Sequence, residues 1–292
     1  MNISNTIKII SVISFALLSG LSGTVVLADK QADNKESSPA ILVIGASFAN
    51  GSTPYLSGLE APLGGIAVNF GSFLSLGDAL IRSPHLSGHV INEAQAGATS
   101  FDRLACNPSP TCSNAGWDGL DKQFTKALSR VSFPDANNPG QYAVLNAEYV
   151  VISFLNDCLH PDAFGIPFGQ TQECNFDEMY DAITNVIDVA NRALNVGLTP
   201  VVVSMPEYED MSLETFRGAV GFSWVAGEQS YSMFKDLRDA RVLAEVPEAL
   251  LVDAWTGFTP IADGLHPSRS ATLKAAKKLA KAMRHHSRVN NH

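Results

Sequence analysis

Three side chains of this 292-residue chain have the types that nucleophilic catalysis by a serine requires. Ser47 follows the apolar run Ile41–Ile44 and a glycine, a pattern typical of a buried parallel strand whose carboxyl end faces a ligand crevice. Near the other end of the chain, Asp263 precedes His266 by three residues in a loop with glycine and proline, so the carboxylate can orient the imidazole. A serine hydroxyl is a weak nucleophile until a base takes its proton, and the base works best when a third group fixes its tautomer. Ser47, His266 and Asp263 supply all three groups.

Some of these residues also have a plainer interpretation or an alternative. Ser47 can simply cap the helix that follows its strand, as many serines after strands do. His160 is the alternative to His266 as the base, because Asp162 follows it, although through a proline. The remaining histidines near the carboxyl terminus are expected in a basic tail: His285, His286 and His292.

Four short blocks of the sequence, taken in order, resemble those of the SGNH (GDSL-type) hydrolase superfamily: Gly45-Ala46-Ser47-Phe48, the turn at Gly97, Asn156-Asp157 and Asp263-x-x-His266. The resemblance runs from about Ile41 to the end of the carboxyl-terminal helix. It implies a serine esterase or lipase that forms an acyl-serine intermediate and needs no cofactor or metal. It also implies an oxyanion hole made by the backbone N–H groups of Ser47 and Gly97 and by the side chain of Asn156.

Two positions depart from the pattern of this superfamily. Ala46 stands where the family usually has an aspartate just before the serine, and Phe154 stands where a glycine is expected before Asn156. The first departure concerns how the serine turn is held, and the second concerns how Asn156 is placed. Neither removes a member of the proposed catalytic set.

Apolar strand segments alternate with helical patterns along the chain. The expected strands are Ala40–Ile44, Val90–Ala94, Tyr149–Phe154, Thr199–Met205 and Leu250–Ala254. Helices are expected over Phe176–Val196, Gly227–Val246, more weakly Trp117–Arg130, and Ser268 to about Arg284. This alternation predicts parallel strands with helices on both faces, a three-layer α/β/α sandwich. The resemblance implies the flavodoxin-like order for its five-stranded sheet, with all four blocks at one edge.

The first residues have the order of a secretory signal peptide, with Lys8, an apolar stretch and small residues that end at Ala28. We expect cleavage after Ala28 and a secreted or periplasmic location. An uncleaved membrane anchor is the alternative, because the apolar stretch approaches spanning length. Polar residues 29–38 predict a disordered tether, residues 39–286 a single hydrolase-like domain, and residues 287–292 a carboxyl-terminal tail.

The net charge argues against one class of partner. The chain has 20 basic and 29 acidic residues, and removal of residues 1–28 leaves 19 basic residues and a net charge of −10. An acidic chain is a poor ligand for nucleic acid or for anionic lipid. The expected partner is a small-molecule, lipid or glycan ester, with no stable membrane insertion after signal cleavage; no oligomeric state is predicted. The basic closing helix is expected to pack on the sheet, and a membrane-surface helix is its alternative.

All four cysteines lie in the part of the chain that is expected to be exported, where an even number favours disulfides. Of the three possible connectivities, we favour Cys106–Cys112 and Cys158–Cys174, because each closes a local loop. A zinc site is a poor alternative, since no CxxC pair or suitably spaced histidine accompanies the cysteines. A disulfide at Cys158 would brace the loop that carries Asn156.

The sequence therefore predicts an exported serine ester hydrolase. An acyltransferase with the same site is one alternative, and which of the two reactions occurs depends on the exclusion of water. A carbohydrate- or lipid-binding protein that kept the fold but lost turnover is the other, suggested by Ala46 and Phe154. The segment Gly51–Gly71 is a candidate wall for an acyl pocket and is equally explained by core packing.

Overall fold

The structure is a computed structural model that describes residues 38–49, 74–83, 86, 88–104, 116–134, 142–144, 147–153, 157–158, 173–220 and 226–290. All of them belong to one compact unit, Ser37–His292. Several expectations fall outside the described residues and stay predictions. They concern the signal peptide and most of the tether, the segment Gly51–Gly71, His160, Phe154, Asn156, and the pair Cys106 and Cys112.

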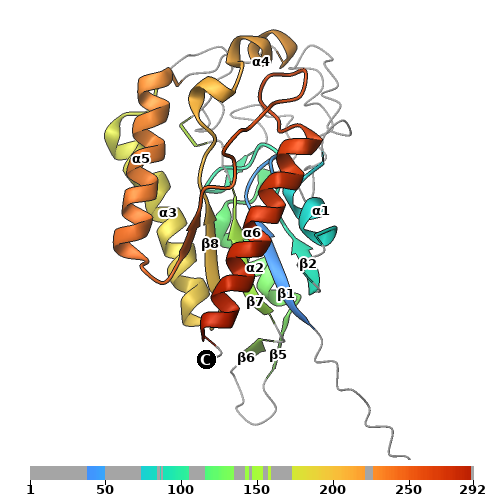
Figure 1. Cartoon of the computed structure of the whole chain (residues 1–292). Helices are drawn as coiled ribbons and strands as arrows, with labels where there is room; N and C mark the ends of the chain where they lie inside the picture. The colour runs from blue at the N-terminus through green and yellow to red at the C-terminus, as the bar shows by residue number, and fades with distance from the viewer. Residues whose placement is uncertain are drawn as a thin grey trace, which may run out of the picture. The chain divides into compact units, whose positions relative to one another are not determined.

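A five-stranded parallel sheet forms the centre of this unit (Figure 1). Its strands lie in the order β2 (Gly88–Asn92), β1 (Ser38–Ile44), β7 (Ala147–Ile152), β8 (Thr199–Val203) and β9 (Leu250–Val252). The order confirms the flavodoxin-like arrangement, and all five strands lie where the apolar segments predict them, within two residues at each end. The inner strands are apolar on consecutive positions because both faces of the sheet are covered, so every side chain from Ile41 to Ile44 is buried.

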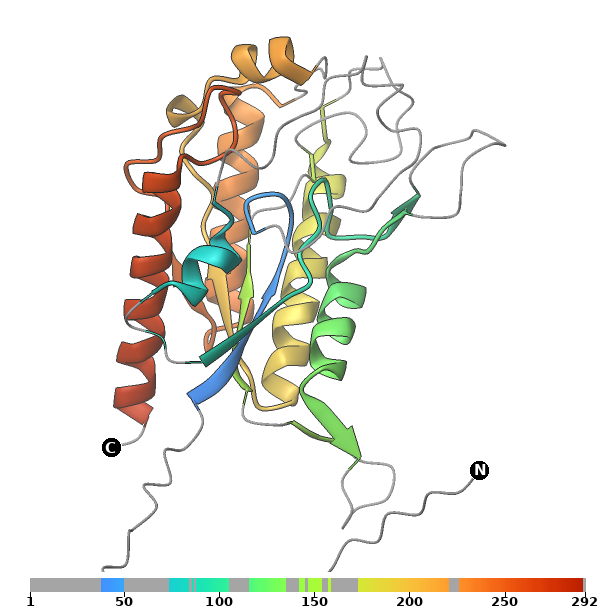
Figure 2. The same ribbon diagram turned by 90° about the vertical axis from the view of Figure 1, so that its right-hand side faces the viewer.

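Helices cover both faces of the sheet, which confirms the three-layer sandwich. Figure 2 shows α1 (Leu76–Ile81) and α6 (Arg269–Asn290) on one side, and α2 (Leu120–Ser129) and α3 (Phe176–Asn195) on the other. Helix α5 (Glu228–Glu245) packs beside α3. The parallel strands and these crossovers bring the loops after β1, β2, β7 and β9 to one edge of the sheet.

Local contacts explain where two of the helices begin. Asn175 caps α3 and forms a capping box with Glu178, since each side chain accepts the other's backbone N–H. Helix α2 begins at Leu120 rather than at the expected Trp117, because Trp117 belongs to the short strand β4 (Gly116–Trp117), which pairs with β3 (Arg103–Leu104).

Several short elements have no counterpart among the expectations from the sequence. They are α1, the 3-10 turn η3 (Tyr208–Asp210), helix α4 (Leu213–Val220) and the hairpin of β5 (Ser132–Pro134) with β6 (Tyr142–Val144). Elements of three to eight residues contain too few turns or alternations to produce a clear periodic pattern.

The carboxyl-terminal helix is longer than expected. Helix α6 continues to Asn290, so the expected tail from residue 287 and the end near Arg284 are wrong. The cause is Tyr149 on β7, whose buried hydroxyl donates to the Met283 carbonyl (2.8 Å) and lies 2.7 Å from the Ser287 Oγ and 3.2 Å from the His286 Nδ1. Burial raises the pKa of this Tyr149 hydroxyl, which therefore stays a neutral hydrogen-bonding group.

The apolar side of α6 packs on the rest of the unit, as expected. Ala276, Ala280 and Met283 are buried, whereas Leu273 is 41% exposed. Helix α6 contacts both α1 and β9. No helix of the described residues combines the length and the apolar character needed to cross a membrane.

Candidate active site

The glycine that directly follows the first strand cannot easily be replaced by another residue. Gly45 has φ = 137°, and a Cβ added there would lie 3.0 Å from the Cβ of Ser153, at the end of β7. The Gly45 N–H donates to Oε1 of the fully buried Gln123 (2.8 Å), and its carbonyl accepts from the Gln95 N–H (3.0 Å). These hydrogen bonds tie the end of β1 to α2 and to the loop after β2, just before the serine.

Ser47 lies in the tight turn that follows this glycine, and 5% of its surface is exposed. The Asn92 side chain donates to the Ala49 carbonyl (2.8 Å), and the Phe48 carbonyl accepts from the Leu76 N–H (2.9 Å). Asn92, at the end of β2, thus fixes the serine turn, in which position 46 is alanine. Within the described residues the next helix is α1, and its N-cap is Ser75 rather than Ser47.

Gly97 lies in the loop after β2, and its φ of 84° is a conformation that favours glycine. Gln95 exchanges two hydrogen bonds with Asp118: its amide nitrogen donates to Oδ2 (2.7 Å), and its oxygen accepts from the Asp118 N–H (2.9 Å). The Trp117 indole donates to the Ala96 carbonyl (2.5 Å). The loop therefore has a defined backbone course at the position where the resemblance places an oxyanion donor.

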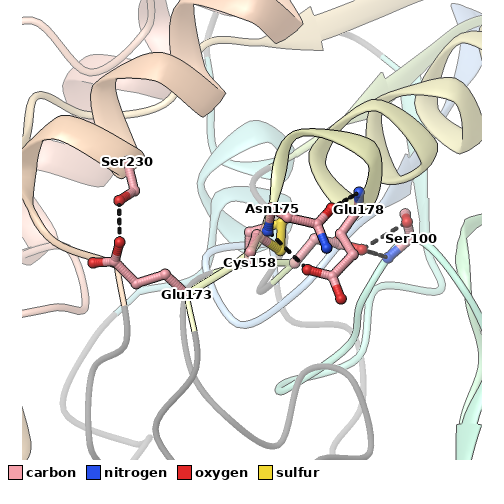
Figure 3. Close-up of a disulfide and its surroundings, with 8 residues drawn as sticks. Ser100, Cys158, Glu173, Asn175, Glu178 and Ser230 are labelled. Atoms are coloured by element: carbon pink, nitrogen blue, oxygen red, sulfur yellow. Dashed lines mark hydrogen bonds between the residues drawn. A yellow bond between two sulfur atoms is a disulfide. The ribbon is translucent and has the colours of Figure 1, made fainter.

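The two residues that follow Asn156 in the sequence, Asp157 and Cys158, are firmly anchored. Asp157 is buried and accepts from the N–H and the hydroxyl of Ser100. Cys158 forms a disulfide with Cys174, as predicted, with their Cα atoms 5.1 Å apart. Cys158 has φ = 61°, an uncommon conformation for a residue other than glycine. Figure 3 shows the disulfide between Ser100 on one side and the Glu173–Ser230 hydrogen bond on the other.

Asp263 and His266 form a hydrogen-bonded pair in the loop that precedes α6, with His266 buried and Asp263 partly buried. The His266 Nδ1 lies 2.6 Å from Oδ2 of Asp263, while Oδ1 accepts from the backbone N–H groups of Leu265 and His266, both at 2.9 Å. Burial alone would raise the pKa of the Asp263 carboxyl. The hydrogen bond and charge of His266 and the two backbone donors outweigh burial and hold this pKa below its ordinary value. An ionised Asp263 fixes the ring so that Nε2 points away from the carboxylate.

The loop around this pair is tightly closed. The Ile261 N–H donates to the His266 carbonyl (2.7 Å). Gly264 has φ = 80°, and a Cβ there would lie 2.2 Å from the carbonyl oxygen of Ser212. The Ser212 N–H in turn donates to the Gly264 carbonyl (2.8 Å). Glycine at position 264 is therefore required for the loop to pack against the start of α4.

An aromatic cluster joins this loop to the serine turn. The ring of Phe48, which follows Ser47, stacks on Phe258 with centroids 5.8 Å apart and lies edge-on to Trp255 at 5.3 Å. The same ring lies 6.2 Å from the imidazole of His266. The ring of Phe216 also lies near the imidazole, with the centroids 6.1 Å apart.

The path of the chain explains why the loop of His266 lies beside the serine turn. Strand β9 is at the edge of the sheet, three positions away from β1, yet α6 packs beside α1. The connection from β9 to α6 therefore passes back over the carboxyl end of the sheet, as Figure 1 shows. The structure brings the turns of Ser47 and Gly97 and the pair Asp263–His266 to this edge. No cluster of three or more histidine, cysteine, aspartate or glutamate side chains suited to a metal occurs among the described residues.

The residues that hold the site were not found by the sequence reasoning. Asn92, Gln95 and Gln123 are polar side chains that bond to backbone far away in sequence, for which no local pattern exists. The apolar, aromatic character of Phe48 was visible, but its contact with His266 depends on the fold.

No protein-family model matches the chain, and the comparison with curated proteins found no match. Solved structures do resemble it. A proposed SGNH hydrolase from Slackia heliotrinireducens is 18% identical, with a TM-score of 0.46 over 84% of this chain and 99% of that one. The psychrotrophic esterase EstA from Pseudoalteromonas sp. is 11% identical (TM-score 0.46; 86% and 99%). A variant of an acetyl xylan esterase from Geobacillus stearothermophilus is 14% identical (TM-score 0.47; 85% and 95%).

Proposed function

We propose that the chain is a serine ester hydrolase of the SGNH (GDSL-type) superfamily in which Ser47, His266 and Asp263 form the catalytic triad. The observation that carries the proposal is the hydrogen-bonded Asp263–His266 pair, 2.6 Å between Oδ2 and Nδ1, whose imidazole packs on the residue next to Ser47. A serine, an oriented imidazole and an ionised carboxylate are the groups that acyl transfer requires.

In the proposed first half-reaction the Ser47 Oγ attacks the ester carbonyl carbon. The bond from Oγ to carbon forms while the Oγ proton passes to Nε2 of His266, and the carbonyl π electrons move onto oxygen. The tetrahedral intermediate then collapses: the bond to the alcohol oxygen breaks, and the His266 proton passes to the leaving alcohol. The ionised Asp263 stabilises the imidazolium throughout without taking its proton.

In the second half-reaction water attacks the acyl-serine. His266 takes a proton from the water and returns it to Ser47 as the carboxylic acid leaves. An acceptor other than water would make the same chemistry an acyl transfer. The proposed oxyanion donors are the N–H groups of Ser47 and Gly97 and the side chain of Asn156. Proton transfer and these donors account for the whole reaction, so the mechanism has no step that needs a cofactor.

The proposed compartment is outside the cytoplasm. Two observations support this: the pattern of the first 28 residues and the Cys158–Cys174 disulfide, a bond that persists in oxidising compartments. The proposed substrate is an ester of a small molecule, a lipid or a glycan.

Covalent labelling tests the proposed nucleophile. A fluorophosphonate probe is expected to label the wild-type protein once, at Ser47, and to leave a folded Ser47→Ala variant unlabelled. Peptide mapping of the labelled protein identifies the site. A folded wild-type protein that takes no label would overturn the proposal and favour a binding protein that has kept the fold.

A further inference from the structure

Two loops that meet at the candidate site are joined by one buried carboxylate. Asp157 is 1% exposed and follows β7, whereas Ser100 is 3% exposed and lies three residues after Gly97 in the loop from β2. The Ser100 N–H lies 2.8 Å from Oδ2 and 3.0 Å from Oδ1 of Asp157, and the Ser100 hydroxyl donates to Oδ1 (2.6 Å). One residue thus gives both of its donors to one carboxylate.

Helix α3 also contributes to the contact between Ser100 and Asp157. The Asn185 side chain, on α3, donates to the Ser100 Oγ (3.0 Å). The hydroxyl therefore accepts from Asn185 while it donates to Asp157, which fixes the direction of its proton. Directly beyond Asp157, the Cys158–Cys174 disulfide ties the chain to the start of α3. The carboxylate cannot shift without moving elements on both sides of it.

The loop that carries Gly97 is consequently held at two points. Gln95 is fixed to Asp118 at one end, and Ser100 is fixed to Asp157 at the other. Gly97 lies between them and, without a Cβ, has a backbone that needs outside support to keep one conformation. Donors to an oxyanion act only if they are aimed in advance at the position of the developing charge.

We propose that Asp157 is a positioning residue that acts through Ser100 to aim the Gly97 backbone N–H at the oxyanion. This inference rests on the proposed function, because it assigns to the carboxylate a role in that reaction. Asp157 itself does not touch the reacting atoms. Its loss should therefore weaken the binding of the transition state far more than the binding of the ester.

The test compares three variants. Asp157→Asn keeps the shape of the side chain but loses the charge and one acceptor. Ser100→Ala keeps the backbone donor and loses the hydroxyl, so its effect should be smaller. Glu173→Gln is the matched control, because Glu173 also accepts from a backbone N–H (Gly227, 3.0 Å) and a serine hydroxyl (Ser230, 2.8 Å), but at the start of α5.

The readouts are kcat, KM and the affinity for an alkyl boronic acid, whose tetrahedral adduct with Ser47 places an oxygen at the oxyanion position. We expect Asp157→Asn to lower kcat by roughly ten- to 100-fold, the loss that a small misplacement of a reacting group causes. KM should change little, and boronic acid affinity should fall by the same factor as kcat. In a Gly97→Ala background, Asp157→Asn should lower kcat little further, since the backbone N–H of residue 97 is already displaced.

Three outcomes would overturn the inference. One is that Asp157→Asn and Ser100→Ala lower the melting temperature but leave kcat and boronic acid affinity unchanged, as Glu173→Gln should. Another is a full, additive loss in the Gly97→Ala background. If Asp157→Asn does not fold, Ser100→Ala alone decides between these results. The third outcome is that the wild-type protein hydrolyses esters no faster than Ser47→Ala. That result would overturn the proposed function together with this role, whereas the first two outcomes would overturn this role alone.

Discussion

The ring of Phe48 lies 6.2 Å from the ring of His266, so the residue next to the proposed nucleophile packs on the proposed base. The two residues are near opposite ends of the chain, and the contact depends on the connection from β9 passing back over the sheet. The aromatic cluster of Phe48, Trp255 and Phe258 therefore fixes the serine turn and the histidine loop relative to each other.

Replacement of Phe48 should uncouple the base from the nucleophile. Phe48→Leu keeps an apolar side chain but loses the stacking on Phe258, and we expect kcat to fall at least tenfold with a stability loss on the order of 1 kcal/mol. Phe216→Leu is the matched control, because the Phe216 ring also lies against His266 but belongs to α4 rather than to the serine turn. Steady-state kinetics and chemical denaturation measure both effects. Equal losses of kcat in the two variants would contradict the proposed coupling.

Asp263→Asn should greatly reduce turnover while the fold is retained. The amide cannot stabilise an imidazolium and favours the wrong ring tautomer, so we expect a loss in kcat of about 10³–10⁴. Asp253→Asn provides a control in the same segment, since Asp253 accepts a hydrogen bond from Thr256 (2.6 Å) but does not contact His266. If the Asp263 variant kept a tenth of the wild-type kcat, the carboxylate would not have the proposed role.

The same aspartate should make stability depend on pH. The pKa of Asp263 is lower in the folded protein than its ordinary value, so its ionised form stabilises the fold. That contribution is complete above the unfolded pKa of about 3.9 and is lost as the pH falls through the folded pKa. The difference in unfolding free energy between wild type and Asp263→Asn should therefore narrow between about pH 5 and about pH 2.5. Urea denaturation of both proteins at both pH values measures this difference in unfolding free energy. The same difference at the two pH values would contradict the prediction.

The sequence predicts the framework better than the site. Long apolar runs such as Ile41–Ile44 mark buried strands because both faces of the sheet are covered, and a local cysteine pair such as Cys158 and Cys174 can be matched by loop length. The last turn of α6 escaped prediction because its partner, Tyr149, lies on a central strand. The supports of the serine turn escaped for the same reason, since Asn92 and Gln123 bond to distant backbone.

The Cys158–Cys174 disulfide should contribute to stability. It joins residues 16 positions apart, and a loop of this length corresponds to about 3 kcal/mol of unfolded-state entropy. Reductant should therefore lower the melting temperature of the wild-type protein. A Cys158→Ser, Cys174→Ser double variant serves as the control. Because it lacks this bond, reductant should lower its melting temperature less. The same decrease in both proteins would show that this disulfide does not stabilise the fold.

The central claim is that Ser47 is the nucleophile of an ester hydrolase. The most direct measurement is the hydrolysis of p-nitrophenyl acetate, butyrate and longer-chain esters by the wild-type protein and Ser47→Ala side by side, with circular dichroism to show that both are folded. We predict turnover that depends on acyl length in the wild-type protein and only background hydrolysis in the variant. Equal rates in the two folded proteins would contradict the assignment of Ser47.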